Sequence, residues 1–286
     1  MDTKGFSYKK NKFLVRLFGR KLMFTYRYYE IRRHLPDFSN PKDLSEIIIS
    51  RILSNEVLRF SHLADKVKVR DYIRSKGLGS ILLHHYGYWN NVDSIELDSL
   101  PERFVLKTNR GEGGHDVCIC RDKSQFDFAS AKEKLQRTMY HHYLYDYQYE
   151  SIEPMVLCEE LIDTGSERQP TDYKFLCIHG EPVSIFVAMG RENGRAKFCS
   201  KSLMWEDLND IRPKLRTSIE PTKPKHLTEM INIAKILCAD FDLVRVDLYE
   251  YKDQVYFGEL TFSPGGGLFS YTNEAVEKYG KLFNQL

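Results

Sequence analysis

The sequence lacks a long apolar run. No uninterrupted apolar stretch approaches the roughly 18 to 20 residues that a membrane-spanning helix needs, and the N-terminus has no signal-peptide core. We therefore expect the protein to stay in the cytoplasm, where it is made. Internal repeats and low-complexity segments are also missing, and 286 residues suffice for a substantial core in one large or two smaller domains.

The sequence also lacks closely paired cysteines with metal-site spacing and a large net charge. The six cysteines are scattered through apolar runs without the spacing of a zinc site, which indicates buried, reduced thiols. Cys118 and Cys120 share one face of an expected strand, so we predict packing and no disulfide between them. The net charge of +2 gives no electrostatic reason for a nucleic-acid partner.

Residues 241–271 hold the strongest pattern that is present. Apolar and charged residues alternate on both sides of a turn at 252–254, which predicts a β-hairpin. Arg245 and Asp247 project from one face, as do Glu259 and Thr261 on the partner strand.

A glycine-rich turn, Ser263–Gly267, follows this hairpin, and its missing Cβ atoms allow close approach to a ligand. Two carboxylates, one guanidinium and this turn suit a site for Mg²⁺ and phosphate. The alternative is a solvated, salt-bridged sheet face.

Residues 8–33 mix Lys and Arg with Phe, Leu, Met and Tyr, which predicts a basic amphipathic helix broken or softened at Gly19. Such a helix can lie on an anionic membrane surface or hold a polyanion. The alternative is that it packs on the main body by its aromatic side, with its cations in water. We treat residues 1–35 as a separate segment.

The other expected elements alternate between helices and strands. Helices are expected at 47–58, at 64–76 with a glycine cap at Gly77, at 130–149 and at 227–238. Strands are expected at 104–107, 117–120, 156–162, 172–177 and 183–189. The polar stretch 190–225 shows no clear pattern.

A glycine-rich loop separates the first two of these strands. Gly111, Gly113 and Gly114 leave backbone N–H groups free to wrap phosphate oxygens, and Lys107 adds a positive charge beside them. The loop has neither the ending of a Walker motif nor the spacing of a dinucleotide fingerprint. A flexible turn is the alternative.

Several of these motifs occur together and in order: Asp65-Lys66, FVLK-TNRGEGG, VLCEEL, DYKFLCIHGEP and VRVDLYE…VYFGELTFSPGGG. Over residues 36–275 they resemble the ATP-grasp superfamily, and more narrowly the TupA-like proteins linked to teichuronopeptide and capsular polysaccharide synthesis. The resemblance implies an α+β fold in which two subdomains with mainly antiparallel sheets hold ATP between them. The helical segment 1–35 would precede a catalytic region at 36–286 with a lid at approximately 100–160.

The resemblance also assigns the residues that contact ATP. Lys107 would hold the α- and β-phosphates, Lys66 belongs to the early Asp-Lys motif, and Gly111, Gly113 and Gly114 would form the lid over the β- and γ-phosphates. The adenine-binding hinge would consist of Glu159, Glu160, Leu161 and Ile162. Asp172 is then placed for the ribose, and Lys174 for a phosphate or a neighbouring carboxylate.

Metal-binding and catalytic roles follow from the same resemblance. Asp247 and Glu259 would bind Mg²⁺, Arg245 would neutralise the transferring phosphoryl group, and Lys197 would be a further phosphate-reaching lysine. Thr261 stands where many ATP-grasp ligases have Asn, so its hydroxyl would be a weaker third metal ligand.

The implied activity is that of an ATP- and Mg²⁺-dependent carboxylate-amine ligase that forms an amide through an acyl phosphate. We expect it to join an amino acid or amine to a cell-surface polysaccharide or its sugar precursor. Its partners would be carboxylate and amine substrates carried by a glycan, and a membrane surface for the N-terminal segment. The alternatives are a kinase acting on a sugar hydroxyl, and a non-catalytic module that binds a membrane or an anionic glycan.

Overall fold

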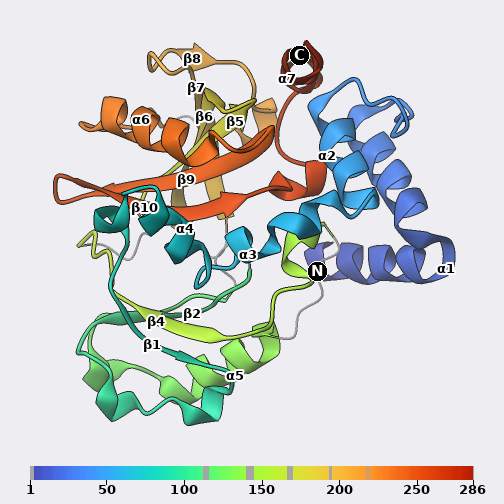
Figure 1. The fold of residues 1–286 in the computed structure, drawn as a ribbon. Coiled ribbons are helices and arrows are strands. Elements are labelled where there is room, and N and C mark those ends of the chain that lie inside the picture. The colour runs from blue at the N-terminus through green and yellow to red at the C-terminus, as the bar shows by residue number, and fades with distance from the viewer. Residues whose placement is uncertain are drawn as a thin grey trace.

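The computed structural model describes residues 3–111, 116–139, 145–165, 170–192, 195–217 and 219–285. Over these residues the chain forms two antiparallel sheets, one above the other in Figure 1, with helices around them. The predicted α+β architecture with a helix at the N-terminal end is confirmed. No helix in the described part of the chain combines the length and apolarity needed to cross a bilayer.

The larger sheet has the strand order β10-β9-β5-β6-β7-β8, and all neighbours are antiparallel. Its strands are β5 (Asp172–Ile178), β6 (Glu181–Glu192), β7 (Arg195–Lys201), β8 (Asp207–Leu208), β9 (Leu243–Tyr251) and β10 (Gln254–Thr261). The stretch without a clear sequence pattern thus contains β7 and β8.

Helix α6 (Leu227–Cys238) covers one face of this sheet, in contact with β5, β6 and β9. Val244, Val246 and Leu248 are buried in the core under α6. Because side chains alternate along a strand, Arg245 and Asp247 point to the opposite face. The turn between β9 and β10 places Lys252 and Asp253 at positive φ, as a tight hairpin turn requires, so the predicted hairpin is confirmed.

The smaller sheet has the order β1-β4-β2-β3. Its strands are β1 (His85–Trp89), β2 (Phe104–Thr108), β3 (Cys118–Cys120) and β4 (Val156–Glu159). Helix α5 (Phe128–Met139) packs on it through Ala131, Leu135 and Met139. The strand β1 was not expected from the sequence. All six cysteines are buried and unpaired, as predicted.

Three further helices lie at one end of the molecule: α1 (Thr3–Arg32), α2 (Leu44–Leu53) and α7 (Asn273–Asn284). Asp43 caps α2, because its carboxylate accepts a hydrogen bond from the Glu46 N–H at 2.8 Å while the Glu46 carboxylate reaches back to the Asp43 N–H. The helix expected at 47–58 therefore starts earlier and ends at Leu53. Short 3₁₀ turns occur at Glu56–Phe60, Gly79–Ile81, Val92–Ser94, Leu97–Ser99, Lys123–Gln125, Tyr147–Tyr149, Pro213–Leu215 and Pro264–Gly267.

The helices expected at 64–76 and 130–149 are both interrupted. The first is split into α3 (Ser61–Ala64) and α4 (Val69–Ser75), because the Asp65 side chain accepts a hydrogen bond from the Val67 N–H and turns the chain between them. Gly77 ends this region at φ 77°, as predicted. In the second, α5 ends at Met139 within the described residues, and residues 147–149 form a 3₁₀ turn.

The glycine turn after β10, where close approach to a ligand was expected, approaches the protein itself at Gly266 and Gly267. At Gly266 an added Cβ would lie 2.6 Å from the Tyr145 side chain, and at Gly267 it would lie 2.8 Å from the Ser45 carbonyl oxygen. Of the three glycines in the 3₁₀ turn, Gly265 lines the cleft described below. Gly266 and Gly267 thus fix the position of the turn against α2 and its surroundings.

We expect a Gly267→Ala variant to lower the free energy of unfolding by about 2 to 4 kcal/mol, because the residue has φ +74° and its Cβ would meet backbone. The matched control is Gly79→Ala, where the nearest atom to a Cβ is a flexible arginine side chain at 3.6 Å. The control should change stability by less than about 1 kcal/mol. Urea denaturation measures both, and equal midpoints for the two variants would contradict the prediction.

Candidate functional site

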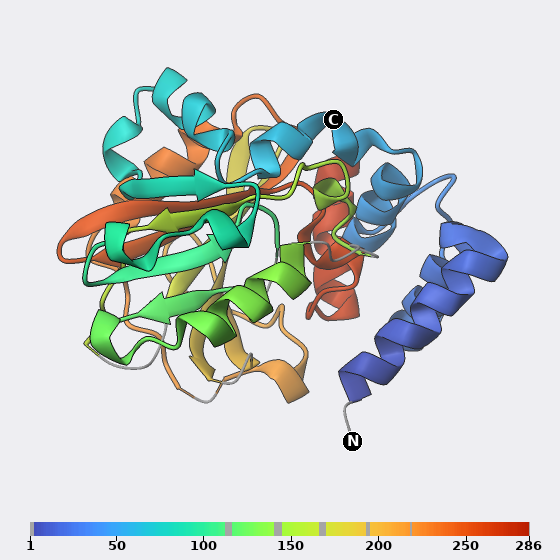
Figure 2. The same cartoon turned by 90° about the horizontal axis from the view of Figure 1, so that it is seen from below.

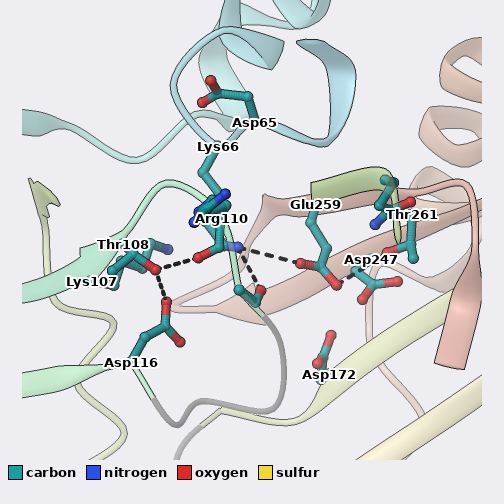
Figure 3. A network of polar contacts seen from close by, with 12 residues as sticks. Asp65, Lys66, Lys107, Thr108, Arg110, Asp116, Asp172, Asp247, Glu259 and Thr261 are labelled. Carbon is teal, nitrogen blue, oxygen red and sulfur yellow. Dashed lines mark hydrogen bonds and ion pairs between the residues drawn. The ribbon is translucent and has the colours of Figure 1, made fainter. Parts of the chain in front are cut away.

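The register of β9 and β10 brings four polar residues onto one face. Glu259 lies opposite Asp247, and Thr261 lies opposite Arg245. The Arg245 guanidinium donates to both Asp247 carboxylate oxygens at 2.7 Å and to Glu259 Oε1 at 2.9 Å. One cation therefore bridges the two carboxylates, which lie close together in Figure 3.

Strand β5 continues this polar row across the sheet. Lys174 lies opposite Asp247, and its ammonium forms ion pairs with the carboxylates of Asp247 and Asp172. Lys174 is 7% exposed and Asp247 only 1%. Buried ion pairs of this kind, on one face of a sheet, indicate a functional site that binds charged groups.

The other side of the site comes from the smaller sheet. Lys107 on β2 forms an ion pair with Glu159 on β4, and His85 Nε2 on β1 lies 3.5 Å from the same carboxylate. Burial alone would raise the pKa of Glu159, but Lys107 and His85 outweigh it and lower the pKa to about 2. Glu159 therefore holds Lys107 in place.

Lys66 connects the two sides. It lies in the turn between α3 and α4, where its N–H donates to the Asn109 carbonyl at 2.9 Å. Its ammonium donates to the Gly111 carbonyl at 2.9 Å and lies 3.8 Å from Glu259 Oε2 (Figure 3). The break in the expected helix thus lets Lys66 point into the site.

The buried charges shift one another's ionisation. Burial raises the pKa of Asp247 to about 6, against the opposing effect of Arg245 and Lys174. Burial also disfavours the charged form of Glu259, but Lys66, Arg245 and Lys174 outweigh it and hold its pKa well below the usual range. At neutral pH both carboxylates are ionised and held by protein cations.

A cleft of about 320 Å³ between the sheets contains these groups. Lys66, Lys107, Lys174, Arg245, Asp247 and Glu259 all line it. At another part of its wall, Leu161 and Ile162 follow the end of β4. The Glu160 N–H already donates to the His84 carbonyl at 2.9 Å, so of the predicted hinge residues Leu161 and Ile162 are the better placed for a base.

The cleft has an aromatic wall that the sequence did not reveal, formed by Phe186, Phe198 and Phe269. Phe186 on β6 lies opposite Lys174, in line with the row of charged residues. Two strand spacings separate it from Asp247, which is about 10 Å. The ring centroids of Phe186 and Phe198 are 4.9 Å apart. Only the pairing of strands distant in sequence joins these rings to the charged row.

Some predicted residues cannot be placed in the site. Gly113 and Gly114 lie outside the described residues, as does the side chain of Lys197, whose backbone pairs with Met189 between β7 and β6. Gly111 lines the cleft at φ +144°. Thr261 donates its hydroxyl to Glu259 at 3.1 Å and accepts from Arg245 at the same distance.

Arg110, in the predicted glycine motif, does not line the cleft. It is buried, and its guanidinium donates to the carbonyls of Met139, Tyr149 and Ile152. Its role is to hold the end of α5 and the turn after it beside β2. Beside it, the Thr108 hydroxyl contacts the Asp116 carboxylate (Figure 3).

The chemistry of the acidic pair fits Mg²⁺ shared with a phosphate. Asp247, Glu259 and Thr261 offer hard oxygen atoms from adjacent strands, and Glu259 Oε2 lies beyond hydrogen-bond distance of Lys66. Among the described residues no cluster of three or more acidic, histidine or cysteine side chains forms a complete metal cage.

A model of one protein family, described as TupA-like ATPgrasp, matches residues 46–283. The chain belongs to the TupA-like ATP-grasp family. The family and the fold inferred from the sequence motifs are both confirmed. The cleft between the two sheets is thus the cleft of an ATP-grasp protein, and α1 precedes the part that matches the family.

Solved structures with some likeness include D-alanine-D-alanine ligases. The protein from Helicobacter pylori is 15% identical, with a TM-score of 0.41 over 77% of this chain and 60% of that one. The D-alanine-D-alanine ligase from Bacillus anthracis is 18% identical, with a TM-score of 0.44 over 78% of this chain and 65% of that one. The D-alanyl-alanine synthetase A of Vibrio cholerae O1 biovar eltor str. N16961 is 13% identical, with a TM-score of 0.45 over 77% of this chain and 62% of that one.

The TupA-like chain therefore spans about 60% of the length of the first of these enzymes. At this level of similarity their activities do not transfer to it. A search of curated proteins found no match.

Proposed function

We propose that the protein is an ATP- and Mg²⁺-dependent ligase that joins a carboxylate to an amine. The observation that carries the proposal is the convergence of Lys66 and Lys107 from one side of the cleft on Arg245, Asp247 and Glu259 from the other. Phosphoryl transfer is catalysed mainly by positioning and charge stabilisation, which such a set of residues provides.

Each residue has a role in this proposal. Lys66, Lys107 and Lys174 bind phosphate oxygens, Leu161 and Ile162 offer backbone groups to adenine, and Asp172 binds the ribose. Asp247, Glu259 and Thr261 would hold Mg²⁺. When bound, ATP supplies the γ-phosphoryl group and Mg²⁺ supplies positive charge against its oxygens. Arg245 stabilises the negative charge of the phosphoryl group during transfer.

The proposed reaction has two parts. A carboxylate oxygen of the substrate bonds to the γ-phosphorus and ADP leaves, which gives an acyl phosphate. The amine nitrogen then bonds to the acyl carbon, phosphate leaves and the amine gives up a proton. In this proposal Arg245 binds both the carboxylate and the phosphate that leaves, since a guanidinium has several donors in one plane.

The aromatic wall supports a sugar-containing substrate. Phe186 lies about two strand spacings from Asp247, roughly 10 Å, which leaves room for one sugar ring beside the reacting group, and Phe198 and Phe269 line the same cleft. The flat face of a pyranose carries C–H groups that pack on the negative face of an aromatic ring. We therefore propose a cell-surface polysaccharide or its sugar precursor as one substrate, with an amino acid or amine as the other.

A screen of ADP release tests the proposal. The wild-type protein is supplied with ATP, Mg²⁺, each amino acid and glycans that contain uronic acids, and the products are weighed by mass spectrometry. A ligase yields ADP, free phosphate and a product that has gained the amine and lost water. Phosphate retained on the glycan would identify a kinase instead, and absence of ADP release with every pair would contradict catalysis on these substrates.

A further inference from the structure

Helix α1 changes its surroundings at Gly19. After this residue Met23, Phe24 and Tyr28 are fully buried in the core that α1 shares with α2. Arg32, 1% exposed, donates to the Tyr271 carbonyl at 2.7 Å and to the Ser45 hydroxyl at 2.9 Å. The second half of α1 is therefore part of the body, as one of the two alternatives predicted.

The first half of α1 presents large apolar side chains to solvent. Phe13, Leu17 and Phe18 are 60%, 55% and 58% exposed, and we call these three residues the docking face. Phe13 and Leu17 lie one turn apart, and so on the same side of the helix. Leu22, just after the bend, is also exposed.

The bend at Gly19 separates the two halves. Gly19 has φ 78° and ψ 169°, a conformation that a residue with a side chain rarely adopts, so the predicted break is confirmed. In Figure 2 α1 lies along one side of the molecule. The exposure of Phe13, Leu17 and Phe18 shows that the described part of the protein leaves the docking face uncovered.

Positive charge is concentrated on helix α1. Between Thr3 and Tyr29 the sequence has no Asp or Glu and eight basic residues: Lys4, Lys9, Lys10, Lys12, Arg16, Arg20, Lys21 and Arg27. The whole chain carries only +2, so the remainder is net negative. Arg16 and Lys21, beside the docking face, are exposed.

We propose that the first half of α1 docks on an anionic membrane surface. Exposed apolar rings enter the boundary between headgroups and acyl chains, and lysine and arginine side chains bind the anionic headgroups. A symmetric contact between the α1 helices of two copies is less favourable, because it would bring eight positive charges against eight. The attached protein would work at the cytoplasmic face, where anionic lipids are exposed.

Vesicle co-sedimentation tests the proposal independently of ATP turnover. The full chain is mixed with vesicles of phosphatidylcholine and phosphatidylglycerol in a ratio of about 3:1, or of phosphatidylcholine alone, at about 0.1 M salt and at about 0.5 M salt. We expect binding to the anionic vesicles at low salt, and loss of most of it at high salt or without the anionic lipid.

Two matched triple variants test whether vesicle binding depends on the docking face or on exposed apolar side chains anywhere on the protein. Phe13→Ser/Leu17→Ser/Phe18→Ser should weaken binding at least about tenfold. Leu35→Ser/Met204→Ser/Ile219→Ser, at sites 72%, 77% and 64% exposed outside α1, should leave it unchanged. Circular dichroism of both variants reports the fold.

Three results would overturn the proposal: wild-type protein that sediments with neither vesicle, equal binding by the two triple variants, or a wild-type dimer that only the α1 variant dissociates. The last result, measured by analytical ultracentrifugation, would assign the docking face to a second copy.

Discussion

An Asp247→Asn variant is expected to bind ADP at least about a hundredfold more weakly than the wild type in the presence of Mg²⁺. In EDTA the loss of ADP affinity should be far smaller. The amide keeps the volume of the side chain but not its negative charge, and its NH₂ group would face the cations Arg245 and Lys174, which now contact the carboxylate. Isothermal titration calorimetry with ADP, with and without Mg²⁺, measures the difference.

The control makes the same chemical change in the same hairpin. Asp253 lies in the turn between β9 and β10, its side chain is 68% exposed, and it pairs with Lys225 at the surface. Asp253→Asn should bind ADP within about twofold of wild type under both conditions, since exposed ion pairs contribute little. If Asp247→Asn retains the full effect of Mg²⁺, the metal is not bound at this pair of carboxylates.

A Lys107→Met variant should lose ADP affinity by about tenfold to a hundredfold whether or not Mg²⁺ is present, because it removes a direct charge on the phosphates. It should also lower the free energy of unfolding by about 3 kcal/mol, because Glu159 is left buried without its principal cation. Calorimetry measures the first effect and urea denaturation the second.

A double variant separates these two effects. In Lys107→Met/Glu159→Gln the buried charge is gone, so stability should return to within about 1 kcal/mol of wild type. The ADP affinity should stay as low as in Lys107→Met. Recovery of affinity in the double variant would mean that Lys107 contributes only through the structure of the smaller sheet.

The sequence predicted the hairpin of the site because its register is local. Glu259 and Asp247 are separated by one short turn, and alternation along β9 fixes which of its side chains share a face. In β10 the register shifts between Phe257 and Glu259, and this irregularity, which the sequence did not reveal, turns Glu259 away from the core face of Val255 and Phe257. The position of Lys107 beside this hairpin depended on resemblance to a family, since the two come from different sheets. No periodicity within one segment contains that information.

Two further features of the site were missed for different reasons. Phe186 lies in line with the charged row only because β6 pairs with β5, and no pattern within one segment contains that pairing. The turn at Lys66 was missed for a local reason, because the Asp65 side chain accepts a hydrogen bond from the Val67 N–H and overrides helix propensity across 64–76. Average helix propensity does not describe such a bond between one side chain and the nearby backbone.

The buried guanidinium of Arg32 has a practical consequence for anyone who shortens the chain. It binds the carbonyl of Tyr271, whose ring packs against Phe269 at 4.8 Å and Phe186 at 5.9 Å. Deleting the N-terminal helix would therefore remove a contact that holds Tyr271 behind two of the three phenylalanines, and at the same time remove the proposed docking face. Loss of the proposed activity in such a truncated protein would have two possible causes, whereas point changes ahead of Gly19 would alter the docking face and leave the contacts of Arg32 in place.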